Sequence, residues 1–167
     1  MISLVNEINK KKPAKLWLIG PQINDLSIKN AMNKKSFECV EYLGFLDQKA
    51  AFEWVKRAHF GLILLNDVAD YEDTSPNKIF EYMMNGTPFV ATSFPKWESQ
   101  LEGVEGGIFE KEDLEKLASS LTRTYGDTEG YKQMCENALN YSQNEFNWTL
   151  VGEPELLALY NQIVQRL

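Results

Sequence analysis

Apolar residues gather along the chain into short continuous runs separated by longer stretches with helical spacing. The run KLWLI stops at Gly20-Pro21, and the run FGLILL is apolar throughout, as expected for a strand that is buried on both faces. Gly and Pro residues punctuate the remaining runs in the same way. We therefore expect five strands, at Lys15–Ile19, Glu38–Leu43, Phe60–Leu65, Pro88–Thr92 and Gly107–Phe109.

The stretches between these runs place apolar residues three or four positions apart, which is the helical period. Within Asp47–Ala58, for example, Asp47 can cap the N-terminus, while Trp54 and Val55 share one face. Strands that alternate with helices predict an open parallel sheet with helices on both faces, in a single α/β domain over residues 1–167. The expected helices are Ile2–Lys12, Asn24–Lys35, Asp47–Ala58, Pro76 to about Asn85, Lys96–Leu101, Glu112–Tyr125, Tyr131–Phe146 and Glu155–Leu167.

Composition narrows the class of protein. Of 167 residues, 44% are hydrophobic, which is enough apolar surface for a folded core, and the net charge of −7 argues against nucleic-acid binding. No apolar stretch approaches the roughly 20 residues of a membrane span. The first residues do not resemble a secretory signal, and two isolated cysteines suit a reducing compartment, so we expect a cytoplasmic location. Membrane contact remains open, although no basic amphipathic helix argues for it.

Three loops follow the carboxyl ends of predicted strands, where open α/β sheets bind their ligands. They are Gly20-Pro21-Gln22, Gly44-Phe45-Leu46 and Asn66–Lys78. The loops are therefore the first places to look for binding chemistry.

The third loop leads into the most informative helix. Ser75 can cap it, and the backbone N–H groups around Asn77 can hold an anion at its N-terminus. Lys78 is a cation in the same turn, and Glu81 follows on roughly the same face, where a carboxylate can accept ribose hydroxyls. An anion site beside a diol acceptor indicates a nucleotide. The alternative is that Lys78 and Glu81 form a solvent-exposed helical ion pair.

The segment SPNKIFEYMMNGTPFVAT resembles the signature P-x-K-[LI]-F-E-Y-M-x-x-G-x-P-[FV]-V-A of retaining GT-B glycosyltransferases of the family-4-like group. The flanking segments KLWLIGP, VEYLGFLDQKAAFEWVKRAHFGLILL and NWTLVGEPELLALYNQIVQ are similar to other parts of these enzymes. The resemblance runs over nearly the whole chain. It implies the Rossmann-like, nucleotide-sugar-binding half of a GT-B enzyme.

The resemblance also implies roles for individual residues. Glu81 matches the glutamate that contacts the nucleotide ribose, and Lys78 matches the lysine near the diphosphate, so these two are the candidate catalytic residues. Backbone groups from Ser75 through Asn77 to Lys78 would line the phosphates. Further binding residues implied by the match are Gly20 and Pro21 beside the nucleotide, Gly44, Phe45 and Leu46 at the base edge, and Asp73 near the donor sugar.

The chain departs from the family pattern at two places. Asp73 stands where the broader family has the first glutamate of an E-x7-E pair, and the sequence begins at the first helix, without the preceding strand and its Arg and Lys-Gly cations. The N-terminal acceptor domain is also missing from it. We therefore expect the C-terminal part of a larger glycosyltransferase, with no transfer activity on its own. The whole enzyme would move a sugar from a nucleotide diphosphate sugar to an acceptor hydroxyl, with retention and without a metal.

Two other functions stay open at this stage. One is a non-catalytic flavodoxin-like binding or regulatory module, and the other is a sugar-nucleotide epimerase. The acidic loop with Asp67, Asp70, Glu72 and Asp73 could bind a divalent cation, but a solvated loop is the better interpretation. His59 is expected to be structural rather than catalytic.

Overall fold

The computed structural model describes residues 1–21, 37–65, 74–110 and 113–165. The predicted helix Asn24–Lys35 and the acidic loop lie outside these residues. The described elements are α1 (Ile2–Asn9), β1 (Leu16–Ile19), β2 (Val40–Gly44), α3 (Gln48–Val55), β3 (Gly61–Ile63), α4 (Asn77–Met83), β4 (Phe89–Thr92), α5 (Pro95–Gln100), β5 (Gly107–Glu110), α6 (Leu114–Gly126), α7 (Thr128–Asn144), the π-helical turn η3 (Trp148–Gly152) and α8 (Glu153–Val164).

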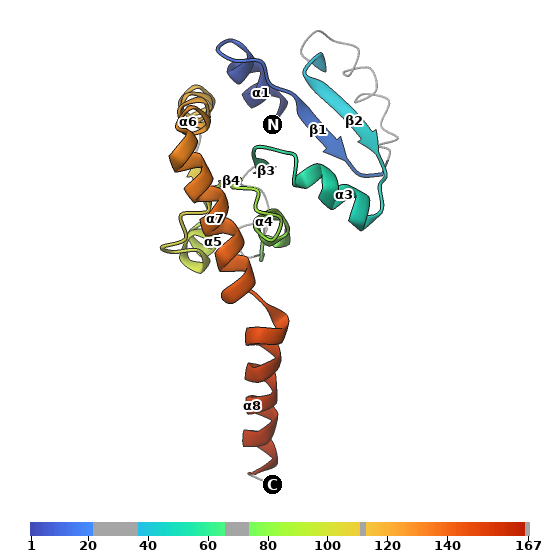
Figure 1. The fold of residues 1–167 in the computed structure, drawn as a ribbon, viewed down its shortest axis with the longest axis vertical. Helices are drawn as coiled ribbons and strands as arrows, with labels where there is room; N and C mark the ends of the chain where they lie inside the picture. The colour runs from blue at the N-terminus through green and yellow to red at the C-terminus, as the bar shows by residue number, and fades with distance from the viewer. Residues whose placement is uncertain (22–36, 66–73, 111–112, 166–167) are drawn as a thin grey trace.

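All five predicted strands form, and every pairing between them is parallel. In the described part of the chain they make two sheets, β1-β2 and β3-β4-β5, rather than the one continuous sheet expected (Figure 1). Leu16 pairs with Val40 in the first sheet, and Gly61 pairs with Phe89 in the second. The expected parallel α/β arrangement is present, and within the described residues its strands form two sheets, with a cavity described below lined by residues of both β1 and β3.

Strand β4 holds the core together because its side chains alternate between two apolar clusters. Phe89 and Ala91 pack with residues of α4, α5 and α7, whereas Val90 packs with Leu4 of α1 and with Leu117, Ala118 and Leu121 of α6. Phe89, Val90 and Ala91 are all at most 1% exposed. The expected α/β architecture with helices on both faces is confirmed, and β4 is buried between them.

The helix boundaries agree with the predicted ones to within a few residues for most elements. Asp47 caps α3 as expected, its carboxylate accepting a hydrogen bond of 2.9 Å from the backbone N–H of Ala50. Asp113 caps α6 in the same way, and its backbone hydrogen bond from Lys116, followed by the Lys116 side chain, lowers the pKa of that carboxyl.

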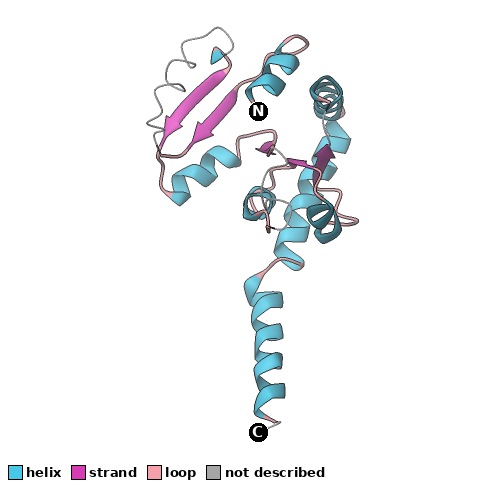
Figure 2. Ribbon diagram, turned by 180° about the vertical axis from the view of Figure 1, so that it is seen from behind, coloured by secondary structure: helices cyan, strands magenta, loops and turns pink. Residues whose placement is uncertain are grey.

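Helix α8 extends away from the rest of the molecule and ends at the far pole of the long axis (Figures 1 and 2). Its nearest contacts are with the turn η3 that precedes it. The apolar side chains it exposes are Leu156, Leu157, Leu159, Tyr160, Ile163 and Val164, while Trp148 and Leu150 in η3 are also exposed.

A glycine at the start of β3 allows α4 to approach the sheet closely. A Cβ atom at Gly61 would lie 2.1 Å from the ring of Tyr82, which is closer than two atoms can approach. Only glycine therefore fits beneath that ring without a shift of the strand or the helix.

We expect Gly61→Ala to lower the free energy of unfolding by about 1–3 kcal/mol, because the added methyl group overpacks a buried contact. Gly126→Ala is the matched control, since a Cβ atom there meets nothing within 4 Å and should change stability by less than about 1 kcal/mol. Urea denaturation followed by circular dichroism measures both. Equal midpoints for Gly61→Ala and the unaltered protein would show that the ring and strand move apart freely.

Candidate functional site

Helix α4 carries both residues that the sequence singled out. It buries Ile79, Phe80 and Met83 against the sheet, so Lys78 and Glu81 lie toward its other side. The Lys78 Nζ lies 2.6 Å from the Glu81 Oε2, and the two side chains are 65% and 33% exposed. The structure therefore contains the solvent-exposed ion pair that the alternative interpretation expects. A nucleotide would have to replace this contact.

The start of α4 differs from the prediction. Its N-cap residue is Pro76, and no side chain caps the helix, so the expected Ser75 cap was wrong. The turn instead closes on its own backbone: the Asn77 N–H donates to the Ser75 carbonyl at 3.0 Å and the Ile79 N–H donates to the Pro76 carbonyl at 2.8 Å. Proline occupies the capping position but has no side-chain acceptor. The Asn77 N–H, which was expected to face an anion, is thus already bonded.

Contacts from two other segments help to fix the position of α4. The indole N–H of Trp97, a residue only 1% exposed, donates to the Thr74 carbonyl at 2.8 Å and holds the segment before the helix. The Phe80 ring stacks on Phe146 of the α7–η3 connection at 3.7 Å between centroids. Trp97 belongs to the buried core, and no local feature of the sequence signals its contact with the Thr74 carbonyl.

The two predicted glycine loops come together at the ends of β1 and β2. The Gly20 N–H donates to the Gly44 carbonyl at 3.0 Å, and the Tyr42 hydroxyl donates to the Gly20 carbonyl at 2.8 Å. Gly44 has a φ of +76°, which favours glycine, and the neighbouring Phe45 is 78% exposed. These two loops therefore form a single surface, with Pro21 and Leu46 beside the bonded glycines.

A cavity of about 570 Å³ lies between β1 and β3, and Lys78 and Glu81 are part of its wall. Most of the wall is apolar and comes from both sheets and four helices. The other predicted site residues that the structure describes, Gly20, Pro21, Gly44, Phe45, Leu46, Ser75 and Asn77, do not line it, and Asp73 lies outside the described residues. The structure thus brings Lys78 and Glu81 together, and separately joins the glycine loops.

Tyr82 adjoins the candidate pair and also lines this cavity. Burial raises the pKa of its hydroxyl above the ordinary value, and the negative charge of Glu81 adds to the effect. Tyr82 therefore stays protonated over the whole physiological range. The sequence gave no reason to select it, because a tyrosine in an apolar helix face is most often only a core residue.

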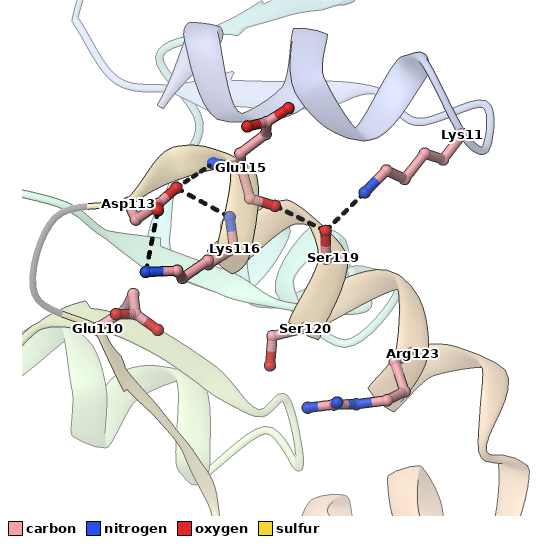
Figure 3. Close-up of a pocket in the computed structure, with 8 residues that line it drawn as sticks. All are labelled: Lys11, Glu110, Asp113, Glu115, Lys116, Ser119, Ser120 and Arg123. Atoms are coloured by element: carbon pink, nitrogen blue, oxygen red, sulfur yellow. Dashed lines mark hydrogen bonds and ion pairs between the residues drawn. The ribbon is translucent and has the colours of Figure 1, made fainter.

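A second cavity, of about 700 Å³, opens beside α6 (Figure 3). Lys11, Lys116 and Arg123 contribute positive charge there, and three carboxylates contribute negative charge. Asp113 is already engaged as the α6 cap, and Lys11 donates to the Ser119 hydroxyl at 2.5 Å. The charges of opposite sign largely balance, so this cavity does not select one kind of ligand.

Of the remaining sequence candidates, the structure describes His59, whereas the acidic loop lies outside the described residues. His59 is exposed, with its ring against Tyr125 at 4.4 Å between centroids. Among the described residues no group of three His, Cys, Asp or Glu side chains is placed to hold a metal ion. Within the same residues, no helix combines the length and hydropathy that crossing a bilayer requires.

We expect Lys78→Ala and Glu81→Ala to leave the free energy of unfolding within about 1 kcal/mol of the original, because an exposed ion pair contributes only about 0.3–0.5 kcal/mol. Phe80→Ala on the buried face of the same helix should cost about 3–5 kcal/mol. Urea denaturation of the three variants tests this contrast. A large loss with Lys78→Ala would give the pair a structural role.

Comparison with known proteins identifies a family for this chain. The family model described as glycosyl transferases group 1 matches residues 1–127. No curated protein matches this sequence. Sucrose-phosphate synthase from Thermosynechococcus elongatus is similar in structure, with a TM-score of 0.76, 19% identity, and coverage of 99% of this chain and 42% of that one.

HepE of Anabaena is also similar, in two crystal structures. The complex with UDP has a TM-score of 0.70 and 18% identity, and the complex with UDP and glucose has a TM-score of 0.72 and 17% identity. Both alignments cover 95% of this chain and 44% of HepE, so the chain spans less than half the length of these structural neighbours. With the fold of a GT-B half and a family match over most of its length, the chain belongs to the glycosyl transferases group 1 family.

Proposed function

We propose that this chain is the donor-binding domain of a glycosyltransferase that moves a sugar from a nucleotide diphosphate sugar to an acceptor hydroxyl. The observation that carries the proposal is the pairing of Lys78 and Glu81 on the wall of a cavity, on the helix that bears the family signature. The family match and the UDP bound to the structurally similar HepE support the same donor class.

The two side chains suit different parts of such a donor. The Lys78 ammonium is 65% exposed on a flexible side chain, so it can leave Glu81 and move to a diphosphate oxygen. The Glu81 carboxylate, released from Lys78, can accept hydrogen bonds from the two ribose hydroxyls. Ligand binding would therefore exchange one charged contact for two contacts to the nucleotide.

The reaction requires stabilisation of the negative charge that develops on the leaving diphosphate. The bond between the anomeric carbon and a diphosphate oxygen breaks, and its electron pair stays on the diphosphate. The acceptor oxygen forms the new bond to that carbon, and the hydroxyl proton passes to the released diphosphate. A cation held against the diphosphate stabilises the developing charge, which is the role we assign to Lys78. By family resemblance, we propose retention of the anomeric configuration.

The acceptor would bind to the second half of the enzyme, and that half lies outside this sequence. The structural neighbours are more than twice as long as the matched region, which supports this division. We infer that residues 1–167 alone bind the donor weakly and transfer little or no sugar. A cytoplasmic location remains part of this proposal.

We expect UDP, GDP or ADP to bind, and Lys78→Ala and Glu81→Ala each to weaken that binding by about 1–3 kcal/mol through loss of a charged hydrogen bond. Isothermal titration calorimetry with each nucleotide measures the effect. No binding by any nucleotide up to millimolar concentration would contradict a donor domain.

The chain offers a matched control for this experiment. Glu53 and Lys56 on α3 form an ion pair with the same three-residue spacing and a 2.7 Å contact. Glu53→Ala and Lys56→Ala should leave the nucleotide affinity unchanged. Equal effects of the α3 and α4 pairs would show a general dependence on surface charge rather than a site at α4.

We also expect nucleotide affinity to be similar in EDTA and in magnesium, because Lys78 supplies the positive charge beside the diphosphate in this proposal. Calorimetric titration under both conditions tests the point. A loss of binding in EDTA that magnesium restores would instead assign the diphosphate contact to a bound cation.

A further inference from the structure

The first turn of α4 is weakly held within the helix itself. The helix has seven residues, and no side chain caps its N-terminus. Short helices without a cap fray at their ends, because the first N–H groups have no intrahelical partners. The spacing that lets Lys78 and Glu81 meet at 2.6 Å nevertheless exists only while this turn is helical. A contact from outside the helix is therefore needed to keep the turn formed.

Trp97 of α5 supplies such a contact, through the indole N–H that donates to the Thr74 carbonyl at 2.8 Å. Thr74 lies just before the N-cap residue Pro76, and Lys78 follows in the first turn. The anchored carbonyl is therefore close enough along the chain to limit the movement of that turn.

Packing fixes the direction of this indole N–H. Trp97 is 1% exposed, and its ring meets the Phe94 ring edge to face, with 4.9 Å between the centroids. Trp97 also belongs to the apolar cluster that contains Ile79 and Phe80 of α4. One side chain thus shares a core with the buried face of the helix and bonds the backbone that precedes it.

We propose that Trp97 is a positioning residue of the donor site: it keeps the first turn of α4 formed, so that Lys78 reaches the diphosphate while Glu81 holds the ribose. This inference rests on the proposed function, from which it takes the two nucleotide contacts. Glu81 follows Phe80, which is 7% exposed and stacks on Phe146, so its position depends on a separate contact. Loss of the indole N–H should therefore weaken binding of the diphosphate and spare binding of the nucleoside.

The test compares UDP, GDP and ADP with uridine, guanosine and adenosine, which lack the diphosphate, by NMR titration of the whole chain. Trp97→Phe keeps an aromatic ring in the core but removes the N–H donor. We expect this variant to weaken binding of the diphosphate about fivefold, as the loss of one hydrogen bond does, and to change nucleoside binding by less than about twofold. A role in folding alone would move both affinities together.

Further variants identify the route of the effect. If Trp97 acts through Lys78, Trp97→Phe in a Lys78→Ala background should change the affinity for the diphosphate by less than about twofold, because residues that act together are not additive. Tyr141→Phe is the matched control: its hydroxyl donates to the Gln100 carbonyl at 3.3 Å, and its ring packs against the same apolar cluster. It should leave both affinities unchanged. If Trp97→Phe does not fold, 3-benzothienylalanine at position 97 keeps the ring shape, replaces the N–H with sulfur and decides in its place.

Amide exchange without nucleotide separates this inference from the proposed function. The Ile79 N–H, which donates to the Pro76 carbonyl in the first turn, should exchange about tenfold faster in Trp97→Phe, because local opening of that turn becomes easier. The Met84 N–H, which donates to the Phe80 carbonyl at the other end of the helix, should change least.

Three results would overturn the inference. They are an unchanged exchange rate at Ile79, an equal loss of nucleoside and diphosphate affinity, and additive effects of Trp97→Phe and Lys78→Ala. If the unaltered chain binds no nucleotide, the proposed function fails, whereas the exchange rate at Ile79 still decides whether Trp97 holds the turn.

Discussion

The structure depends on the burial of β4 from both sides. A parallel strand in a sheet interior can bond to neighbours on both edges and pack side chains on both faces, so its buried positions are mostly apolar. Phe89 and Ala91 join one apolar cluster and Val90 joins the other. This alternation connects α4, α5 and α7 to one face of the sheet and α1 and α6 to the other. It also sets the position of α4, which immediately precedes β4 and carries Lys78 and Glu81.

The sequence was sufficient to predict most of the elements because their signals are local. The FGLILL run predicts β3, and Asp47 predicts the start of α3, since burial and capping act within a few residues. The interruption of the sheet could not be predicted in the same way. A strand's sequence specifies that it is apolar, but which strand lies beside it depends on contacts between distant segments.

The candidate site likewise has features with a local sequence signal and features that depend on distant segments. The spacing of Lys78 and Glu81 on one helix predicts that they can meet, and they do. The capping role of Ser75 was wrong because Pro76 ends the irregular segment and the backbone carbonyls there accept the first hydrogen bonds. Trp97 reaches Thr74 from beyond β4, so its role in positioning the helix had no local signal.

The contact between Gly61 and Tyr82 has a consequence for the geometry of the site. Tyr82 follows Glu81 in α4, and its ring lies directly on the backbone of β3. Rotation of α4 about its axis would turn the Glu81 carboxylate and the Tyr82 ring through the same angle, and the strand beneath the ring resists that rotation. A glycine without a side chain thus limits the orientational freedom of a carboxylate on a neighbouring element. The direction in which Glu81 can present its oxygens is therefore determined in the sheet as much as in the helix.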